Sequence, residues 1–181
     1  MIITFGGGWS NNYTDAFHIL QKYGFTATIF LTVAYIGTKK NYLDWDQVKE
    51  MRKKDFEFGS HTLTHPHLTK IPLEKARLEI EESKKQMESQ LGEEVLSFCY
   101  LYGDYNQDII KLVKEAGYMC AVVTPTSGRC ESSIYTIRRV GLYSTDTMLS
   151  LLVKTSWVER VIAANKIIWT MAKSLKKWAK I

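Results

Sequence analysis

The architecture of this chain can be inferred from one segment, Phe58-Gly59-Ser60-His61-Thr62-Leu63-Thr64-His65-Pro66-His67. It holds three of the four histidines and follows a short run, 56–58, that alternates like a β-strand. Two imidazoles four residues apart can face one point if the backbone curls through a helical turn after the strand. This pattern favours a metal or acid–base site, because histidine ligates metals and titrates near neutral pH. The alternative is a polar loop whose histidines only form hydrogen bonds.

The remainder of the chain alternates predicted strands with predicted helices and contains no internal repeat. Strands are expected at 1–5, 25–33, 56–60, 95–100, 118–124 and 135–142, and helices at 13–23, 44–54, 72–91 and 106–116. This alternation predicts an α/β fold with a parallel sheet. Functional residues of such folds gather at the carboxyl ends of the strands, where the glycine triplet 6–8, His61 and Cys99 fall.

Several helix ends have recognisable signals. Asn11 or Asn12 is expected to cap the helix at 13–23, and Asp44 with Gln47 resembles a capping box. The run 79–85, Glu-Ile-Glu-Glu-Ser-Lys-Lys, places acids and bases three and four residues apart and is interpreted as a solvated helix face.

Composition restricts the class of protein. The 181 residues suffice for one globular domain, and 45% of them are apolar. No apolar run is long enough to span a bilayer, and the first residues have neither the basic region nor the cleavage site of a signal peptide. Three widely spaced cysteines argue against a disulfide framework. A cytoplasmic location is therefore expected, with the option of attachment to a membrane surface.

Positive charge is concentrated at the C-terminus. Residues 154–181 carry seven Lys or Arg and one acid, a net of +6, which leaves −1 for residues 1–153 from the chain total of +5. We therefore divide the sequence into a domain, 1–153, and a basic tail, 154–181. An apolar stripe at helical spacing runs through the tail: Trp157, Val161, Ala164, Ile168, Met171, Leu175 and Trp178.

Such an amphipathic helix, 156–181, can lie on an anionic membrane surface. Alternatively, its stripe packs on the domain or on a second copy of the chain. Nucleic acid is not an expected partner, because the domain has no basic patch and no nucleic-acid-binding motif.

Three segments resemble the motifs of one family. Residues 59–66 resemble the metal-binding motif of the polysaccharide deacetylases, the NodB-homology domain. Residues 4–8, Thr-Phe-Gly-Gly-Gly, resemble that family's Thr-Phe-Asp-Asp-Gly with both aspartates replaced. Residues 98–106 resemble its Phe-Arg-x-Pro-Tyr-Gly-x-Tyr-Asn with Arg and Pro replaced. The resemblance covers about residues 2–143 and implies a distorted (β/α) barrel, usually seven-stranded, that hydrolyses carbon–nitrogen bonds in N-acetylated carbohydrate with a divalent metal, commonly zinc.

Carried over by position, the resemblance makes His61 and His65 the metal-binding histidines. Gly7 stands where the family has its metal-binding aspartate, and Gly6 where it has the aspartate that acts as general base. Cys99 stands where an arginine orients that base. The family's late histidine, a general acid, has no counterpart, because no histidine follows His67.

The resemblance also implies a substrate groove. Tyr102 and Gly103 match residues that line it, and the rings of Tyr100, Tyr102 and Tyr105 are candidates for stacking on sugars.

These replacements predict a poor or inactive deacetylase. Catalytic zinc usually has three protein ligands, so metal affinity should be low unless Asp15 or Cys99 supplies the third. Glycine cannot act as a general base. The alternative is a non-catalytic carbohydrate-binding or membrane-peripheral scaffold protein. A second interpretation of the glycine triplet, an anion cradle of backbone N–H groups, lacks the spacing of phosphate-binding loops.

The origin of the glycines stays open between natural decay, a deliberate substitution and a sequence error, because aspartate and glycine codons differ by one base. The chain also ends without the family's last motif, which fits a fragment or a shortened branch.

Overall fold

The computed structural model of the chain describes residues 2–124 and 133–156. The chain divides into two compact units, Met1–Arg139 and Val140–Ile181. This division lies upstream of the boundary that we expected after residue 153. The predicted tail helix and its apolar stripe lie outside the described residues, as does most of the loop that follows residue 124.

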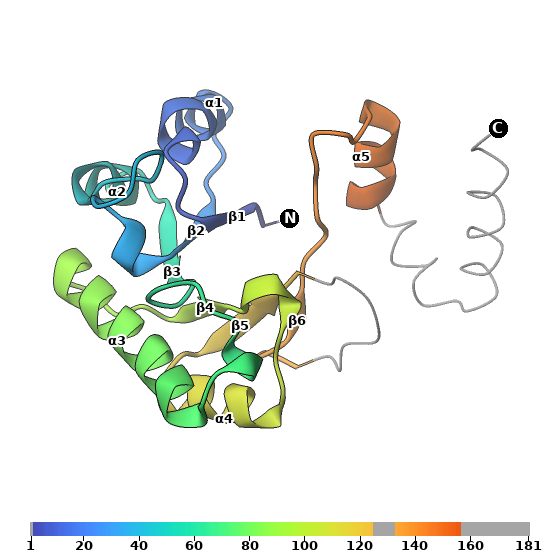
Figure 1. Cartoon of the computed structure of the whole chain (residues 1–181). Helices are drawn as coiled ribbons and strands as arrows, with labels where there is room; N and C mark the ends of the chain where they lie inside the picture. The colour runs from blue at the N-terminus through green and yellow to red at the C-terminus, as the bar shows by residue number, and fades with distance from the viewer. Residues whose placement is uncertain (1, 125–132, 157–181) are drawn as a thin grey trace, which may run out of the picture. The chain divides into compact units, whose positions relative to one another are not determined.

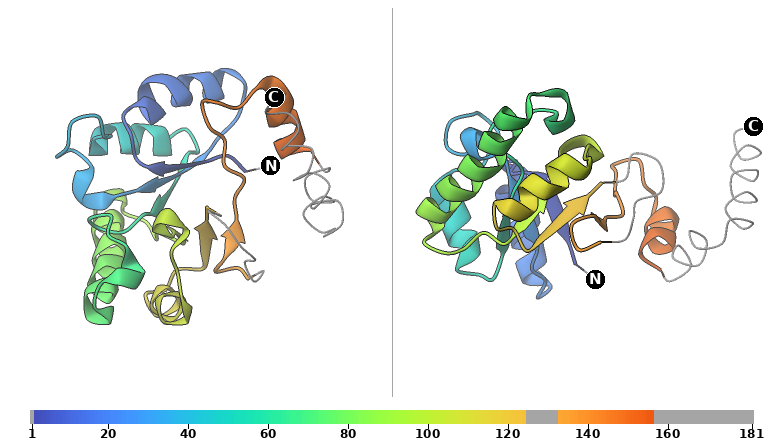
Figure 2. Two further views of the ribbon diagram at one scale, coloured as in Figure 1. Left: turned by 45° about the vertical axis from the view of Figure 1, so that its right-hand side comes forward. Right: turned by 90° about the horizontal axis from the view of Figure 1, so that it is seen from below.

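The first unit is built on a parallel sheet. Its six strands are β1 (Thr4–Gly7), β2 (Thr28–Leu31), β3 (Glu57–Ser60), β4 (Ser97–Cys99), β5 (Cys120–Val123) and β6 (Ile137–Arg138). Each strand pairs in parallel with the next one along the chain, so the order in the sheet is the order in the sequence. A sheet that grows in one direction in this way curls toward a barrel, and Figures 1 and 2 show the curled strands. The predicted distorted (β/α) barrel of parallel strands is confirmed.

Helices connect the strands and lie outside the curled sheet (Figure 1). They are a π-helix, η1 (Asn12–Phe17), four α-helices, α1 (His18–Lys22), α2 (Trp45–Arg52), α3 (Leu73–Leu91) and α4 (Gln107–Glu115), and three short 3-10 turns, η2 (Val33–Tyr35), η3 (Leu68–Lys70) and η4 (Leu101–Gly103). Fully buried side chains such as Ile29, Val48 and Ile80 fill the space between sheet and helices. The strands β2 and β5, which are buried apart from their first residues, are apolar for this reason.

All six strands differ from their predicted limits, and β6, Ile137–Arg138, is much shorter than the predicted 135–142. β1 extends through Gly6 and Gly7, because their backbones pair with Phe30 and Leu31 of β2 whatever the side chain. β2 is shorter than the apolar run 25–33: Phe25 is 53% exposed, and the chain turns into η2 after Leu31.

Helix-end signals were predicted with mixed success. The capping box at Asp44 and Gln47 is confirmed, since each side chain accepts a hydrogen bond from the other residue's backbone N–H. Gly92 ends α3 in the left-handed conformation, with φ of 71°, as expected of a C-terminal glycine. The predicted cap at Asn11 or Asn12 is wrong: the Asn11 side chain makes no capping hydrogen bond, and Asn12 is already inside the π-helix.

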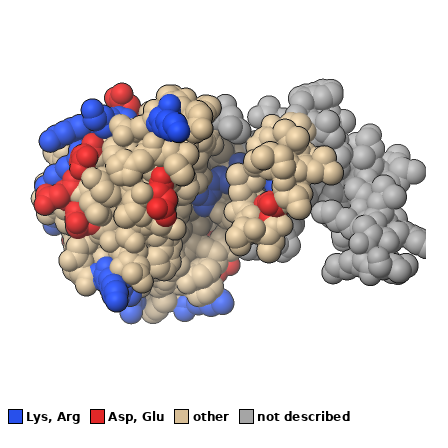
Figure 3. All heavy atoms as spheres, turned by 90° about the horizontal axis from the view of Figure 1, so that it is seen from above, with Lys and Arg blue, Asp and Glu red and all other residues tan. Residues whose placement is uncertain are grey.

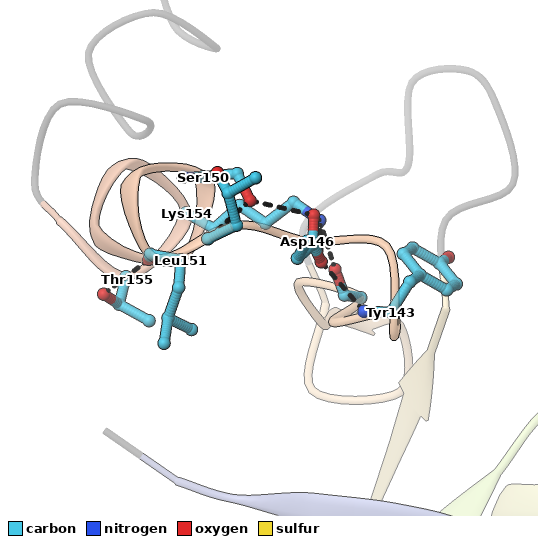
Figure 4. A network of polar contacts seen from close by, with 8 residues as sticks. Tyr143, Asp146, Ser150, Leu151, Lys154 and Thr155 are labelled. Carbon is cyan, nitrogen blue, oxygen red and sulfur yellow. Dashed lines mark hydrogen bonds and ion pairs between the residues drawn. The ribbon is translucent and has the colours of Figure 1, made fainter.

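The described part of the second unit contains α5 (Met148–Thr155). The Thr147 side chain caps this helix by accepting from the Ser150 N–H. Figure 4 shows how Asp146 links the segment before α5 to the helix: its carboxylate accepts from Lys154 Nζ at 2.6 Å and from the Tyr143 N–H at 2.8 Å. The Lys154 ammonium lowers the pKa of Asp146 through this hydrogen bond.

Charged side chains of both signs are interspersed on the face shown in Figure 3, with uncharged surface between them. None of the helices in residues 2–124 and 133–156 has the length and apolar character needed to cross a membrane.

Candidate metal and substrate site

His61 lies directly after β3 and is only 8% exposed. Its Nδ1 is 2.8 Å from the carbonyl oxygen of Cys99, which can only accept a hydrogen bond, so Nδ1 carries the proton. Nε2 therefore presents a lone pair. A backbone carbonyl that fixes the tautomer of a histidine in this way is typical of metal-ligating histidines.

His65 approaches His61 through a turn that is not helical. The two ring centroids are 5.1 Å apart, with the planes at 79°. Thr62 and His65 both have positive φ, 65° and 67°, and Thr62 Oγ1 accepts from the His65 N–H at 3.1 Å. The predicted helical turn is thus wrong, although the predicted convergence of the two rings is confirmed.

Glu79 of α3 holds this turn in place. Its carboxylate accepts from the N–H groups of Leu63 and Thr64, at 3.1 and 2.8 Å, and from the Thr64 hydroxyl at 2.6 Å. Glu79 is 5% exposed, so these charge-assisted bonds form away from water. The position of His65 thus depends on a carboxylate from a different element.

One side of the histidine pair is formed by Tyr102 of η4. Its hydroxyl is 3.0 Å from His65 Nδ1, and its ring stacks on His67 with centroids 3.9 Å apart. Tyr102 is 48% exposed and, like the following Gly103, has positive φ, which turns η4 toward the histidines.

Tyr100, by contrast, is 1% exposed, so its ring offers no face to a sugar, against the role we expected for it.

The two glycines that stand at the aspartate positions differ in their surroundings. A Cβ added at Gly6 would point toward His61 Nε2, 3.8 Å away. A Cβ added at Gly7 would lie 2.8 Å from Nε1 of Trp9, and Gly7 has a φ of +98°. A side chain at residue 6 would therefore meet open space beside His61, whereas a side chain at residue 7 would collide with the Trp9 indole.

Cys99 is fully buried at the end of β4, and its Sγ accepts from Nη2 of Arg139 at 3.0 Å. The same guanidinium donates to Thr4 at the start of β1 and to Thr124 after β5. Arg139 thus places a guanidinium beside residue 99, the position at which the family has an arginine. Burial raises the pKa of the Cys99 thiol to about 11, despite Arg139, so at neutral pH the thiol is protonated and a poor metal ligand.

The donor atoms present do not fit a catalytic zinc site. Within residues 2–124 and 133–156, no group of three His, Cys, Asp or Glu side chains is placed to hold a metal ion. Asp15, a candidate third ligand, is exposed on η1. The two imidazoles are neutral ligands, so a divalent ion between them would keep its full charge.

Burial lowers the pKa of His61 to about 3, with His65 and Arg139 contributing, and burial also lowers the pKa of His65. The unfolded state therefore binds more protons than the folded state between about pH 3 and 6.5, and stability is lost as pH falls through this window. For His61 alone we expect a loss of about 2 kcal/mol between pH 7.5 and 5. Urea unfolding in chelator-treated buffer at both pH values measures it.

The matched variants for this pH effect are His61→Asn and His18→Asn. Asparagine can keep the hydrogen bond to Cys99 without titrating, so the first variant should lose most of the pH slope. His18 is exposed on α1 and its variant should keep the slope. Equal slopes in the wild type and the His61 variant would contradict the assignment.

Glu79 and Arg139 contribute to the site but were not predicted from the sequence. We interpreted 79–85 as solvated, yet Glu79 and Ser83 are 5% and 0% exposed. A signal existed: Ala76, Glu79, Ile80, Ser83 and Met87 recur at helical spacing on one face. Arg139 gave no such signal, because only the pairing of β6 with β5 brings it to the site.

Comparison with known proteins agrees with the fold. The family model for polysaccharide deacetylase matches residues 1–121. YxkH of Bacillus subtilis is 33% identical over 141 residues, 77% of this chain and 50% of that protein. The peptidoglycan-N-acetylglucosamine deacetylase of Bacillus cereus is 32% identical over 117 residues, 64% of this chain and 52% of that protein.

The chain therefore spans about half the length of these curated relatives. Among solved structures, the Streptococcus pyogenes deacetylase PplD in complex with acetate is similar, with a TM-score of 0.79 at 23% identity, over 86% of this chain and 70% of that one. The family model covers well over half of the sequence, and the strand order of the structure is the one that the resemblance implied. This chain belongs to the polysaccharide deacetylase family.

Proposed function

We propose that this member of the family binds N-acetylated carbohydrate at the rim formed by β1, the His61–His67 loop and η4, and that it is a poor or inactive deacetylase. One observation carries the proposal. The rings of His61 and His65 lie edge to face with centroids 5.1 Å apart, yet the two positions that carry aspartates in the family are glycines. The groove residues Tyr102 and Gly103 are retained beside them.

The chemistry of the remaining side chains supports the proposal that deacetylase activity is poor or absent. A general base works best when its pKa lies near the operating pH. The one free imidazole lone pair that faces Gly6 belongs to His61, whose pKa of about 3 makes it a weak base. With two neutral ligands, any divalent metal should be held weakly.

Carbohydrate binding is supported by what remains exposed. Tyr102 presents a partly free ring that His67 holds in place by stacking. Aromatic rings of this kind contact the apolar faces of sugars while hydroxyl groups bind nearby polar atoms. The peptidoglycan-N-acetylglucosamine deacetylase of Bacillus cereus suggests glycans that contain N-acetylglucosamine as the first ligands to test.

The test combines metal analysis, acetate release and binding on the full chain. After incubation with zinc and removal of excess ion, we expect well under one zinc per chain. Acetate release from N-acetylated chitooligosaccharides should stay at the level of a buffer blank, while ligand-observed NMR detects binding that Tyr102→Ala weakens. Stoichiometric zinc together with acetate release would overturn the proposal of poor or absent deacetylase activity. Absence of binding by the folded chain would overturn the proposal of carbohydrate binding.

A further inference from the structure

Trp9 and the partly buried Tyr42 form a stacked aromatic pair that the histidine site does not use, and Trp9 is exposed. Trp9 is 47% exposed, and its ring stacks on Tyr42 with centroids 4.4 Å apart and planes at 27°. We name this pair the Trp9–Tyr42 platform. Because one face of the indole lies on the tyrosine, its exposed surface is on the remaining face and edges.

The backbone keeps this platform rigid. Trp9 and Tyr42 pair as an antiparallel bridge, the Ser10 N–H donates to the Asn41 carbonyl at 2.8 Å, and the Leu43 N–H donates to the Gly8 carbonyl at 2.9 Å. Two loops that are distant in sequence are thereby joined. A ligand that stacks on this indole therefore needs to order little of the protein, which reduces the entropic cost of binding.

The platform adjoins the histidine site at two points. A Cβ added at Gly7 would lie 2.8 Å from Nε1 of Trp9, and a Cβ added at the preceding Gly6 would lie 3.8 Å from His61 Nε2. On the other side, Tyr35 packs edge-on against Tyr42 with centroids 5.0 Å apart, and its hydroxyl donates to the carbonyl of Thr64, the residue before His65. The platform therefore begins three residues after Gly6, which faces His61, and Tyr35 ties it to the loop that carries His65.

We propose that the Trp9–Tyr42 platform is a stacking subsite for a pyranose ring of a glycan chain, adjacent to the ring that is held beside His61, His65 and Tyr102. This inference rests on the proposed carbohydrate binding and extends it to a ligand of at least two sugar units. A pyranose presents a face of C–H groups that an indole covers well, and Trp supplies a large contact area with only two side-chain torsions.

The experiment compares two ligands on the full chain, N-acetylglucosamine and its β-1,4-linked tetramer, by ligand-observed NMR titration. Trp9→Ala should weaken binding of the tetramer about tenfold, a loss of one stacking interaction with its buried area, and should leave the monomer unchanged. Trp9→Phe keeps an aromatic face and should lose much less.

Tyr23→Ala is the matched control, because Tyr23 is also a surface aromatic, 66% exposed at the end of α1. It should not change the affinity for either ligand. Thermal unfolding of each variant establishes that the compared proteins are folded.

The outcomes separate the two proposals. Unchanged affinity of Trp9→Ala for the tetramer, or equal losses for monomer and tetramer, would overturn the subsite while leaving carbohydrate binding intact. Absence of tetramer binding by the folded wild type would overturn the carbohydrate proposal and the subsite together.

Discussion

Replacing Gly6 and Gly7 together by aspartate should raise acetate release from N-acetylated chitooligosaccharides by about 10²–10⁴-fold over the wild type, the typical contribution of a general base. The two substitutions would return to the site both carboxylates that the family motif carries. One carboxylate would face the histidine pair and the other would complete a set of three metal ligands with His61 and His65. Zinc content should rise from well under one ion toward one ion per chain.

The two positions should respond differently when substituted singly. A side chain at Gly6 meets open space toward His61, so Gly6→Asp should fold with little change in stability. Gly7→Asp should lose about 1–3 kcal/mol, because its φ of +98° is strained for any side chain and its Cβ would meet the Trp9 indole. Restoring the metal-binding aspartate at residue 7 therefore requires the backbone there to rearrange, which lowers the stability of the fold.

Gly24→Asp serves as the control for this series. Gly24 also has a positive φ of 69°, and no atom lies within 4 Å of its added Cβ. The control variant should lose stability from the backbone conformation alone and gain neither zinc nor activity. A double variant that binds zinc in full yet releases no acetate would show that the missing late histidine is limiting; one that binds no more zinc than wild type would contradict the assigned ligand geometry.

Cys99 should stay a cysteine in this restoration, although the family motif has an arginine at this position. The guanidinium of Arg139 already contacts Cys99 Sγ, Thr4 and Thr124. A second arginine at residue 99 would place two cations together in a largely buried space, which is destabilising. Adding Cys99→Arg to the double variant should therefore lower stability without raising acetate release, as urea unfolding and the acetate assay would show.

Short sequence patterns predicted those features that depend on residues close together in the sequence. The capping box at Asp44 depends only on neighbouring residues and was predicted correctly. The parallel sheet followed from the alternation of strands and helices, because parallel strands require crossovers, whereas the barrel was implied by the family resemblance. The convergence of His61 and His65 followed from their spacing, but the turn that achieves it did not, since it needs Glu79 from α3.

The features that the sequence did not predict are set by tertiary packing. Whether the indole of Trp9 points outward or toward residue 7 depends on its stacking partner Tyr42, which is thirty-three residues away by its number. The burial of Tyr100 depends on the helices that cover β4, and the arrival of Arg139 depends on β6. A motif identifies which residue types belong at a site, whereas these contacts decide which of them face it.

Glu79→Ala should destabilise the fold by roughly 3–5 kcal/mol, the largest stability effect that we expect from a single substitution at the site. The carboxylate makes three hydrogen bonds, and hydrogen bonds to a charged group contribute about 1.5–3 kcal/mol each without adding fully. Its removal would leave the N–H groups of Leu63 and Thr64 without these partners in a partly buried turn. Urea unfolding at pH 7.5 measures the loss.

Local consequences should accompany the loss of stability. The turn that carries His65 has left-handed residues at Thr62 and His65, and such a backbone persists only where surrounding contacts hold it. Without Glu79, we expect the amides of Leu63 and Thr64 to exchange with solvent far faster and binding of the N-acetylglucosamine tetramer to weaken. Glu79→Gln keeps one acceptor oxygen and should lie between the wild type and Glu79→Ala.

Glu82→Ala is the matched control, because Glu82 follows on the same helix but is partly exposed and pairs only with Lys85 at 3.7 Å among the described side chains. Exposed ion pairs of this kind contribute little, so the control should stay within about 0.5 kcal/mol of the wild type. If Glu79→Ala were no more destabilising than Glu82→Ala, the turn would have to be held by Thr62 and Tyr35 instead. In that case the protection of the Leu63 and Thr64 amides should survive in the Glu79 variant, which hydrogen exchange would show directly.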